Sequence, residues 1–134
     1  MSYAVLGGAL LLAAIGMAQD PGFKAVATVT QLMQAMVIPA SNTLFNLPRE
    51  VPETDEGWAE VRNSAVILAE SGNLLLIGSR AQPSDVWMST SRALVKAGEA
   101  ALRAAQSQDV DAMTEIGNQI IDACETCHEK HWIR

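Results

Sequence analysis

Apolar side chains recur along this chain at the spacing of a helix rather than with the alternation of a strand. The first such segment predicts a helix from about Phe23 to Ile38, ended by Pro39 because a proline ring cannot continue a helix. Its apolar side chains follow one stripe of the 3.6-residue helical period. The stripe contains Val26, Val29, Met33, Met36 and Val37, with Thr30 among them. This segment should therefore pack one face against other helices.

The stretch from Pro39 to Pro52 has the Ser, Asn and Pro content of a loop. It is long for a connection between helices, and loops of such length usually have a function or a packing role of their own. We expect Leu44, Phe45 and Leu47 to pack this loop onto the helices.

Three further helices follow, and each opens at a residue whose side chain can accept a hydrogen bond from a free backbone N–H. The second is expected to start at Thr54 or Asp55 and to end near Ile77. The third should run from Ser84 to about Gln106, and the fourth should begin after Asp109. The sequence therefore predicts an all-α, antiparallel four-helix bundle, an architecture that can hold a cofactor between facing side chains.

The composition agrees with packed helices. Hydrophobic residues make up 49% of the 134 residues and aromatic residues only 4%, whereas sheets concentrate aromatic and β-branched residues. The formal net charge of −6 argues against binding to nucleic acid or to an anionic membrane surface. No Gly-rich phosphate loop and no Ser-His-Asp order is visible, so nothing indicates a hydrolase.

Residues 1–18 are expected to be a cleaved export signal. The stretch from Ala4 to Ala18 is apolar and uncharged, but it is short for a membrane span, which needs about 20 residues. Gly16 and Ala18 supply the small residues that precede a cleavage site. The usual basic start is missing, so an uncleaved anchor and a buried N-terminal helix stay as alternatives. Residues 19–134 would form a periplasmic domain with no stable membrane insertion after signal removal.

The clearest chemical signal is the sequence Cys124-Glu125-Thr126-Cys127-His128, which has the C-x-x-C-H pattern of covalent c-type haem attachment. On a helix, residues three and four apart share one face, so both thiols and the imidazole point the same way. Cys124 and Cys127 can then bond to the two vinyl groups of one porphyrin, with His128 as the proximal iron ligand. We therefore predict one covalent haem c, and export agrees because bacteria attach this haem outside the cytoplasmic membrane.

Three other interpretations of the motif remain. A thioredoxin-like motif would follow a strand, and no strand pattern precedes Cys124. A zinc site needs four ligands, and only His131 lies near enough in the sequence to complete the set. A structural disulfide of this spacing would be strained within a helix.

The four predicted helices, with a C-x-x-C-H motif near the C-terminus, resemble the class II c-type cytochromes, the cytochrome c′ group and its low-spin monohaem relatives. Most other small cytochromes c carry the motif near the N-terminus. The resemblance extends over Gln19 to Arg134, and includes Thr-Gln-Leu-Met at Thr30–Met33, Ala69-Glu70 and Trp87. It implies redox partner proteins and a homodimer formed through the first two helices.

The chain departs from this family after the haem-binding histidine. The family commonly has a tyrosine three residues later and then often an arginine, whereas this chain has His131 and Trp132. In gas-binding members that arginine lies on the proximal haem face, so Trp132 weakens the likeness to them. We expect His131 to be partly exposed near a haem edge.

Other large side chains have simpler expected roles. The tryptophans should fill the core as packing residues; they are Trp58, Trp87 and Trp132. Three arginines could pair with haem propionates, but each is better explained as part of a solvated helix face; they are Arg62, Arg80 and Arg92.

The sixth iron ligand decides between electron transfer and gas binding. Met113 is excluded because the intervening helix places it about 22 Å from the haem histidine. Met36 lies close to the end of the first helix, and the family draws its sixth ligand from that helix rather than from the region of Met88. The resemblance therefore favours Met33, with Thr30 facing an empty sixth site as the alternative.

We expect a periplasmic monohaem cytochrome that transfers single electrons and is not an enzyme. A thioether ligand from Met33 would raise its reduction potential. The alternative function is that of a five-coordinate, cytochrome c′-like protein that binds nitric oxide or carbon monoxide. A zinc-binding or interaction module is a third and weaker hypothesis.

Overall fold

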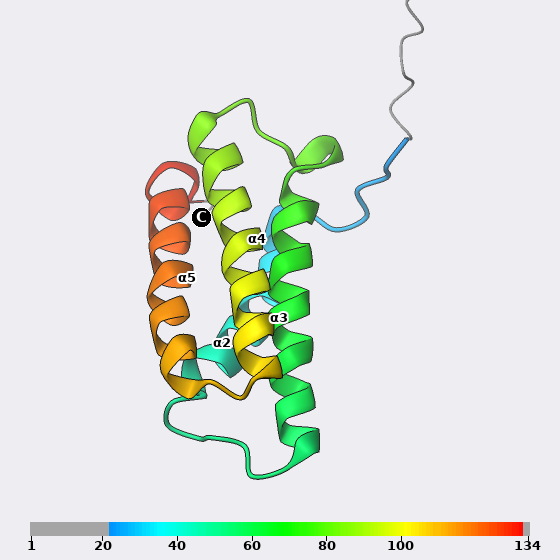
Figure 1. The fold of residues 1–134 in the computed structure, drawn as a ribbon. Helices are drawn as coiled ribbons and strands as arrows, with labels where there is room; N and C mark the ends of the chain where they lie inside the picture. The colour runs from blue at the N-terminus through cyan, green and yellow to red at the C-terminus, as the bar shows by residue number, and fades with distance from the viewer. Residues whose placement is uncertain (1–21, 133–134) are drawn as a thin grey trace, which may run out of the picture.

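The structure is a computed structural model that describes residues 22–132, and every regular element in that range is helical (Figure 1). Four helices pack against one another, which confirms the all-α class. None of the described helices is both long and apolar enough to span a membrane. The expected export segment, residues 1–18, lies outside the described residues.

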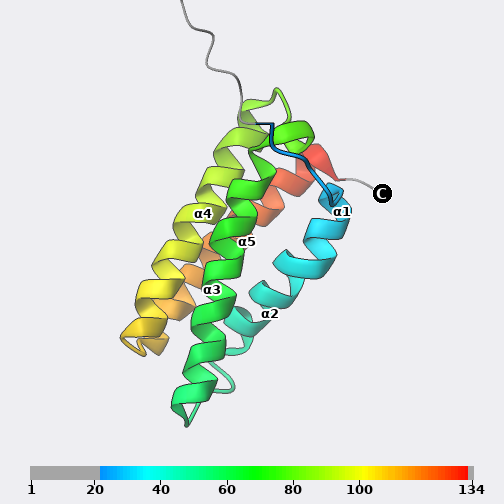
Figure 2. The ribbon, with the colours of Figure 1, turned by 90° about the vertical axis from the view of Figure 1, so that its right-hand side faces the viewer.

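The first helix is continuous and contains a π-helical turn in its middle (Figure 2). The elements in chain order are α1 (Val29–Leu32), the π-turn η1 (Met33–Val37), α2 (Ile38–Asn46), α3 (Asp55–Leu75), the 3₁₀ turn η2 (Gly78–Arg80), α4 (Asp85–Gln106) and α5 (Val110–His131).

The starts of the last three helices are where the sequence predicts them. Thr54 Oγ1 accepts a hydrogen bond from the Gly57 backbone N–H at 3.1 Å, and Ser84 Oγ accepts one from that of Trp87 at 3.4 Å. At the start of α5, Asp109 Oδ1 accepts one at 2.9 Å. These side chains satisfy N–H groups that have no partner within the helix.

The first helix starts later than its apolar stripe suggests, so the predicted start at Phe23 is wrong. Thr28 and Gln31 form a capping box, in which Thr28 N–H donates to Gln31 Oε1 at 3.0 Å and Thr28 Oγ1 accepts from Gln31 N–H at 3.2 Å. Val26 lies before this cap and is 87% exposed. It therefore does not belong to the buried stripe.

The predicted end of the first helix at Pro39 is also wrong, and so is most of the predicted loop. The helix passes through Pro39 and ends at Asn46. The π-turn Met33–Val37 ends two residues before this proline. Leu44 and Leu47 are buried and Phe45 packs against the core, as expected.

Helices α3 and α4 approach each other so closely that their backbones touch. A Cβ atom added to Gly98 would lie 2.6 Å from the backbone nitrogen of Ala69, and one added to Gly72 would lie 2.8 Å from the Ser91 carbonyl oxygen. Alanines continue the contact in both helices, and Ala65 is fully buried. Small side chains thus set the distance between these two helices.

Hydrogen bonds join three helix ends at the end of the molecule that carries the C-x-x-C-H motif. Trp87 Nε1 of α4 donates to the Leu75 carbonyl at the end of α3, at 2.9 Å. Ser84 Oγ and His131 Nε2 are hydrogen-bonded at 3.0 Å. These bonds place the last turn of α5 beside the first turn of α4.

Arg80 is not the solvated side chain that the sequence suggests. It is 8% exposed, and its guanidinium donates to the carbonyls of Leu74 at 2.7 Å and Ala27 at 3.3 Å. It therefore ties the segment before α1 to the end of α3. Arg62 is half-buried and Arg92 is exposed.

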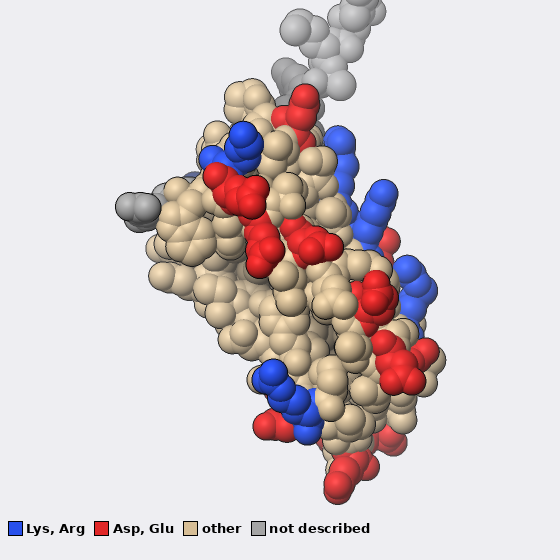
Figure 3. All heavy atoms as spheres, turned by 90° about the vertical axis from the view of Figure 1, so that its left-hand side faces the viewer, with Lys and Arg blue, Asp and Glu red and all other residues tan. Residues whose placement is uncertain are grey.

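The first helix is uncharged along its whole length. No Asp, Glu, Lys or Arg occurs between Lys24 and Arg49. Uncharged surface covers a broad part of one side of the molecule, next to surface where charged side chains gather (Figure 3). The acidic excess of the chain therefore lies outside this helix.

The α3–α4 contact predicts that Gly98→Ala destabilises the fold by about 1–3 kcal/mol, because the added methyl group collides with backbone that cannot yield. Gly117→Ala is the matched control, since its Cβ would meet only Phe45 Cδ1 at 3.8 Å. That substitution should be neutral or stabilising by up to about 1 kcal/mol through helix propensity. Urea unfolding of both variants measures the difference. Equal stability of the two variants would contradict the close contact.

Candidate cofactor site

The C-x-x-C-H motif lies in the last turns of α5. The helical spacing places Cys124, Cys127 and His128 around one side of the helix, and all three line one cavity of about 130 Å³. Both cysteines are free thiols and are half-buried. The structure therefore brings the two thiols and the imidazole together at a single space between helices.

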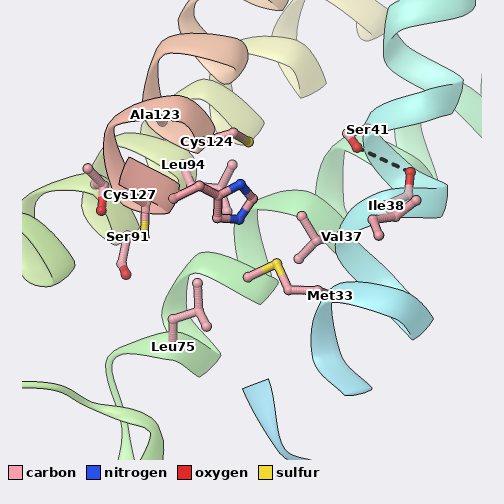
Figure 4. A pocket seen from close by; sticks show the side chains of 12 residues that line it. Met33, Val37, Ile38, Ser41, Leu75, Ser91, Leu94, Ala123, Cys124 and Cys127 are labelled. Atoms are coloured by element: carbon pink, nitrogen blue, oxygen red, sulfur yellow. Dashed lines mark hydrogen bonds between the residues drawn. The ribbon is translucent and has the colours of Figure 1, made fainter. Parts of the chain in front are cut away.

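The opposite wall of this cavity comes from the first helix. Met33 extends its side chain from the π-turn toward the C-terminal turns of α5, with Val37 beside it (Figure 4). Leu75 of α3 and Leu94 of α4 close the other sides. All four helices thus contribute to a space that has a thioether on one wall and the motif on the other.

The cavity wall is apolar apart from the motif and a few hydroxyl groups. Ser41 Oγ donates to the Ile38 carbonyl at 3.1 Å, and Thr90 Oγ1 donates to the Val86 carbonyl at 2.6 Å. Ser91 differs, because its Oγ is the one buried side-chain nitrogen or oxygen atom in the described residues that lacks a hydrogen-bond partner. An apolar space with a few polar groups is typical of a cofactor pocket.

Burial raises the pKa of the Cys124 thiol, and the nearby Cys127 and Glu125 side chains raise it further by adding negative charge. The Cys124 thiol therefore stays protonated in the folded protein at neutral pH. A protonated thiol is a poor nucleophile toward alkylating reagents. It retains the hydrogen that a thiol supplies when it adds to a carbon–carbon double bond.

Two of the three tryptophans are buried as predicted, and the third, Trp132, is not. Trp87 is buried, as predicted, and its ring meets the His131 ring edge to face with centroids 5.3 Å apart. Trp132 is 63% exposed, so its predicted role in filling the core is wrong. Its ring instead meets the His128 ring at 4.9 Å and 84°. Trp58 is buried as predicted.

His131 is half-buried and does not line the cavity. Its hydrogen bond to Ser84 and its contact with Trp87 direct the imidazole toward α4. Within residues 22–132, no group of three or more His, Cys, Asp or Glu side chains is arranged to hold a metal ion. This geometry does not support the interpretation of the motif as a four-ligand zinc site.

The other candidates for a sixth ligand lie away from the cavity. Met113 is 1% exposed within the core, and Met36 and Met88 pack against that core without lining the cavity. Thr30 is exposed and does not line it either. Of the residues considered for this role, only Met33 faces the motif across the cavity.

Sequence reasoning missed Ser91 and the contact of Trp132 with His128. The signal for Ser91 is its position, because it follows Trp87 by four residues and precedes Leu94 by three, on the buried face of α4. The signal for the contact of Trp132 is its spacing, because it follows His128 by four residues and such residues are neighbours along a helix.

Comparisons with protein-family models, with curated proteins and with solved structures find no match to this chain.

Because its pKa is raised, the Cys124 thiol should be alkylated several-fold more slowly than that of Cys127 in folded, haem-free protein near neutral pH. Mass spectrometry of the cysteine peptide after brief iodoacetamide treatment measures this ratio, and denatured protein is the control, with both rates equal. Because the folded pKa is raised, the stabilising effect of the neutral thiol is lost as the pH rises into the alkaline range. Cys124→Ser should remove that part of the alkaline destabilisation. Faster alkylation of Cys124 than of Cys127 would contradict its burial.

Because the Ser91 hydroxyl has no hydrogen-bond partner, Ser91→Ala should cost no stability in haem-free protein. Ser71 provides the matched control, since it is equally inaccessible but donates to the Ile67 carbonyl at 2.6 Å. Ser71→Ala should cost about 1 kcal/mol. Urea unfolding compares the two variants. A loss in Ser91→Ala as large as that in Ser71→Ala would show that Ser91 has a partner in solution.

Proposed function

We propose that this protein is a periplasmic monohaem c-type cytochrome, built as an antiparallel four-helix bundle, that transfers single electrons. The observation that carries the proposal is the cavity where Cys124, Cys127 and His128 face Met33. Two thiols, an imidazole and an apolar wall are the groups that a covalently attached porphyrin requires. When bound, the haem iron would accept and release one electron by changing between the ferric and ferrous states.

The residues of the chain would have distinct roles at this site. Cys124 and Cys127 would each add a thiol S–H across one vinyl double bond, with the sulfur bonding to one carbon and the hydrogen going to the other. His128 would ligate the iron, and the edge of Trp132 would limit rotation of its imidazole. Met33 would ligate the iron from the facing helix.

The enclosed volume constrains how a porphyrin could enter. About 130 Å³ is smaller than the roughly 300–1,000 Å³ of typical ligand pockets. The helices around the motif would therefore have to move apart when the haem is attached. The first helix is best suited to move, since α2 packs mainly on α3 and touches α5 at few points.

The position of Met33 favours electron transfer over gas binding. A thioether ligand would fill the sixth coordination position and keep the iron low-spin, whereas a five-coordinate protein needs that position open. Thr30, which would face an open site in the alternative, is exposed. Binding of nitric oxide or carbon monoxide therefore stays the second candidate.

The remaining parts of the proposal concern location and partners. Residues 1–18 would be the export signal that delivers the chain to the periplasm, where haem c is attached, and residues 19–134 would be the mature domain. Redox partner proteins would exchange electrons with the haem, with no role for nucleic acid. The uncharged first helix is compatible with the homodimer that the resemblance to class II cytochromes implies.

Covalent attachment is the first test of this function. Protein expressed with export to the periplasm should retain its haem under denaturing, reducing conditions, and its mass should exceed that of the polypeptide by one haem. Cys127→Ala should leave at most one thioether and a poorly maturing protein. Ser89→Ala, at an exposed position on α4, is the control and should mature normally. Haem that extracts freely into acidified organic solvent would refute the attachment.

A further inference from the structure

The first helix contains one residue more than an uninterrupted α-helix would need. In the π-turn Met33–Val37, the Ile38 N–H donates to the Met33 carbonyl, five residues back instead of four. Because an α-helix advances by about 100° per residue, one inserted residue rotates the preceding segment by about that angle.

The burial pattern shows this rotation. After the turn, the buried face contains Val37, Ser41 and Leu44, with the normal spacing of three to four residues. Continuing that spacing backward would place Thr30 on the buried face and Leu32 outside. In the structure Leu32 is 3% exposed and Thr30 is exposed. The buried face before the π-turn is therefore shifted by one residue relative to the buried face after it.

The same turn determines where Met33 points. Met33, Ile38 and Ser41 all line the cavity, and Met33 lies on its wall opposite Cys124 (Figure 4). In an α-helix, residues five apart lie about 140° from each other, so Met33 and Ile38 could not both face one small cavity. The π-turn brings them to the same side.

Pro39 lies close to the π-turn and is a residue that disturbs an α-helix. A proline inside an α-helix has no N–H to donate, and its ring collides with the carbonyl four residues earlier, which belongs here to Ala35. The π-turn ends at Val37, directly before Ile38 and Pro39. Widening the helix at this point moves the carbonyls that the ring would meet, and helix distortions of this kind commonly occur at prolines and π-bulges.

We propose that Pro39 is a positioning residue that enforces the π-turn and thereby directs Met33 into the cavity. The inference rests on the proposed function where it makes Met33 an iron ligand. Without Pro39, the segment before it would return to the α-helical register. Met33 would then turn away from the side shared with Ser41, and Thr30 would turn inward.

The test compares Pro39→Ala with Pro48→Ala, which changes a proline outside the helices. In the ferric haem protein, Pro39→Ala should convert most molecules from low-spin to high-spin and should speed carbon monoxide binding at least tenfold in the ferrous form. The haem should stay covalently attached. Unfolding stability should change little, because the better helix propensity of alanine offsets the exposure of Leu32 that the α-helical register brings. Pro48→Ala should retain the wild-type spectrum.

An NMR measurement tests the register itself, with or without haem. The Ile38 amide should bond to the Met33 carbonyl in the wild type and to the Gln34 carbonyl in Pro39→Ala. A π-turn that persists in Pro39→Ala would overturn the proposal, as would an α-helical register in which the iron stays low-spin. Failure of the wild-type protein to attach haem would refute the proposed function instead, and the NMR result would still decide whether Pro39 enforces the turn.

Discussion

The backbone contact between α3 and α4 leaves no space for a Cβ atom at Gly98 or Gly72, and the remaining helices are arranged around this pair. With the two helices this close, Trp87 reaches the Leu75 carbonyl and fixes the start of α4 against the end of α3. The start of α4 in turn holds the end of α5 through the bond from Ser84 to His131. The motif at the end of α5 is thus positioned by packing that begins far from it.

The two walls of the site differ in how extensively they pack on the rest of the bundle. The C-x-x-C-H motif lies on α5, which packs firmly on α4, whereas Met33 lies on a helix that touches α5 at few points and contains a π-turn. A covalently held cofactor needs fixed thiols, and a facing helix that can move would let it enter. The neutral thiol of Cys124 and the apolar lining fit a hydrophobic macrocycle better than a hydrated metal ion.

The features that the sequence predicted correctly depend on residues that lie close together along the chain. Thr54, Ser84 and Asp109 cap the helices that they were expected to cap, because capping depends on a side chain and the next three residues. The spacing of the motif likewise predicted that its three side chains would face one space. The resemblance to class II cytochromes suggested that the facing side chain, Met33, would come from the first helix.

The errors had different causes, and only some of them lie in contacts between distant segments. A proline normally ends a helix, but here a π-turn precedes Pro39 and the helix continues beyond it, with Leu44 and Leu47 buried. Arg80 was expected in solvent, yet it donates to carbonyls of two separate segments. Val26 is exposed because the helix begins after the cap at Thr28. The spacing of apolar residues does not reveal where a helix begins.

The absorption spectrum of the ferric protein, in wild type and in Met33→Ala, tests the central claim most directly. We expect a haem spectrum that is low-spin in the wild type and high-spin in Met33→Ala, because the proposal makes the Met33 thioether, across the cavity from His128, the ligand that this substitution removes. Met113→Leu provides a control at a buried methionine that does not line the cavity. A wild-type protein without a haem band would contradict the cytochrome assignment. A high-spin wild type that binds carbon monoxide rapidly would contradict ligation by Met33 and support the gas-binding alternative.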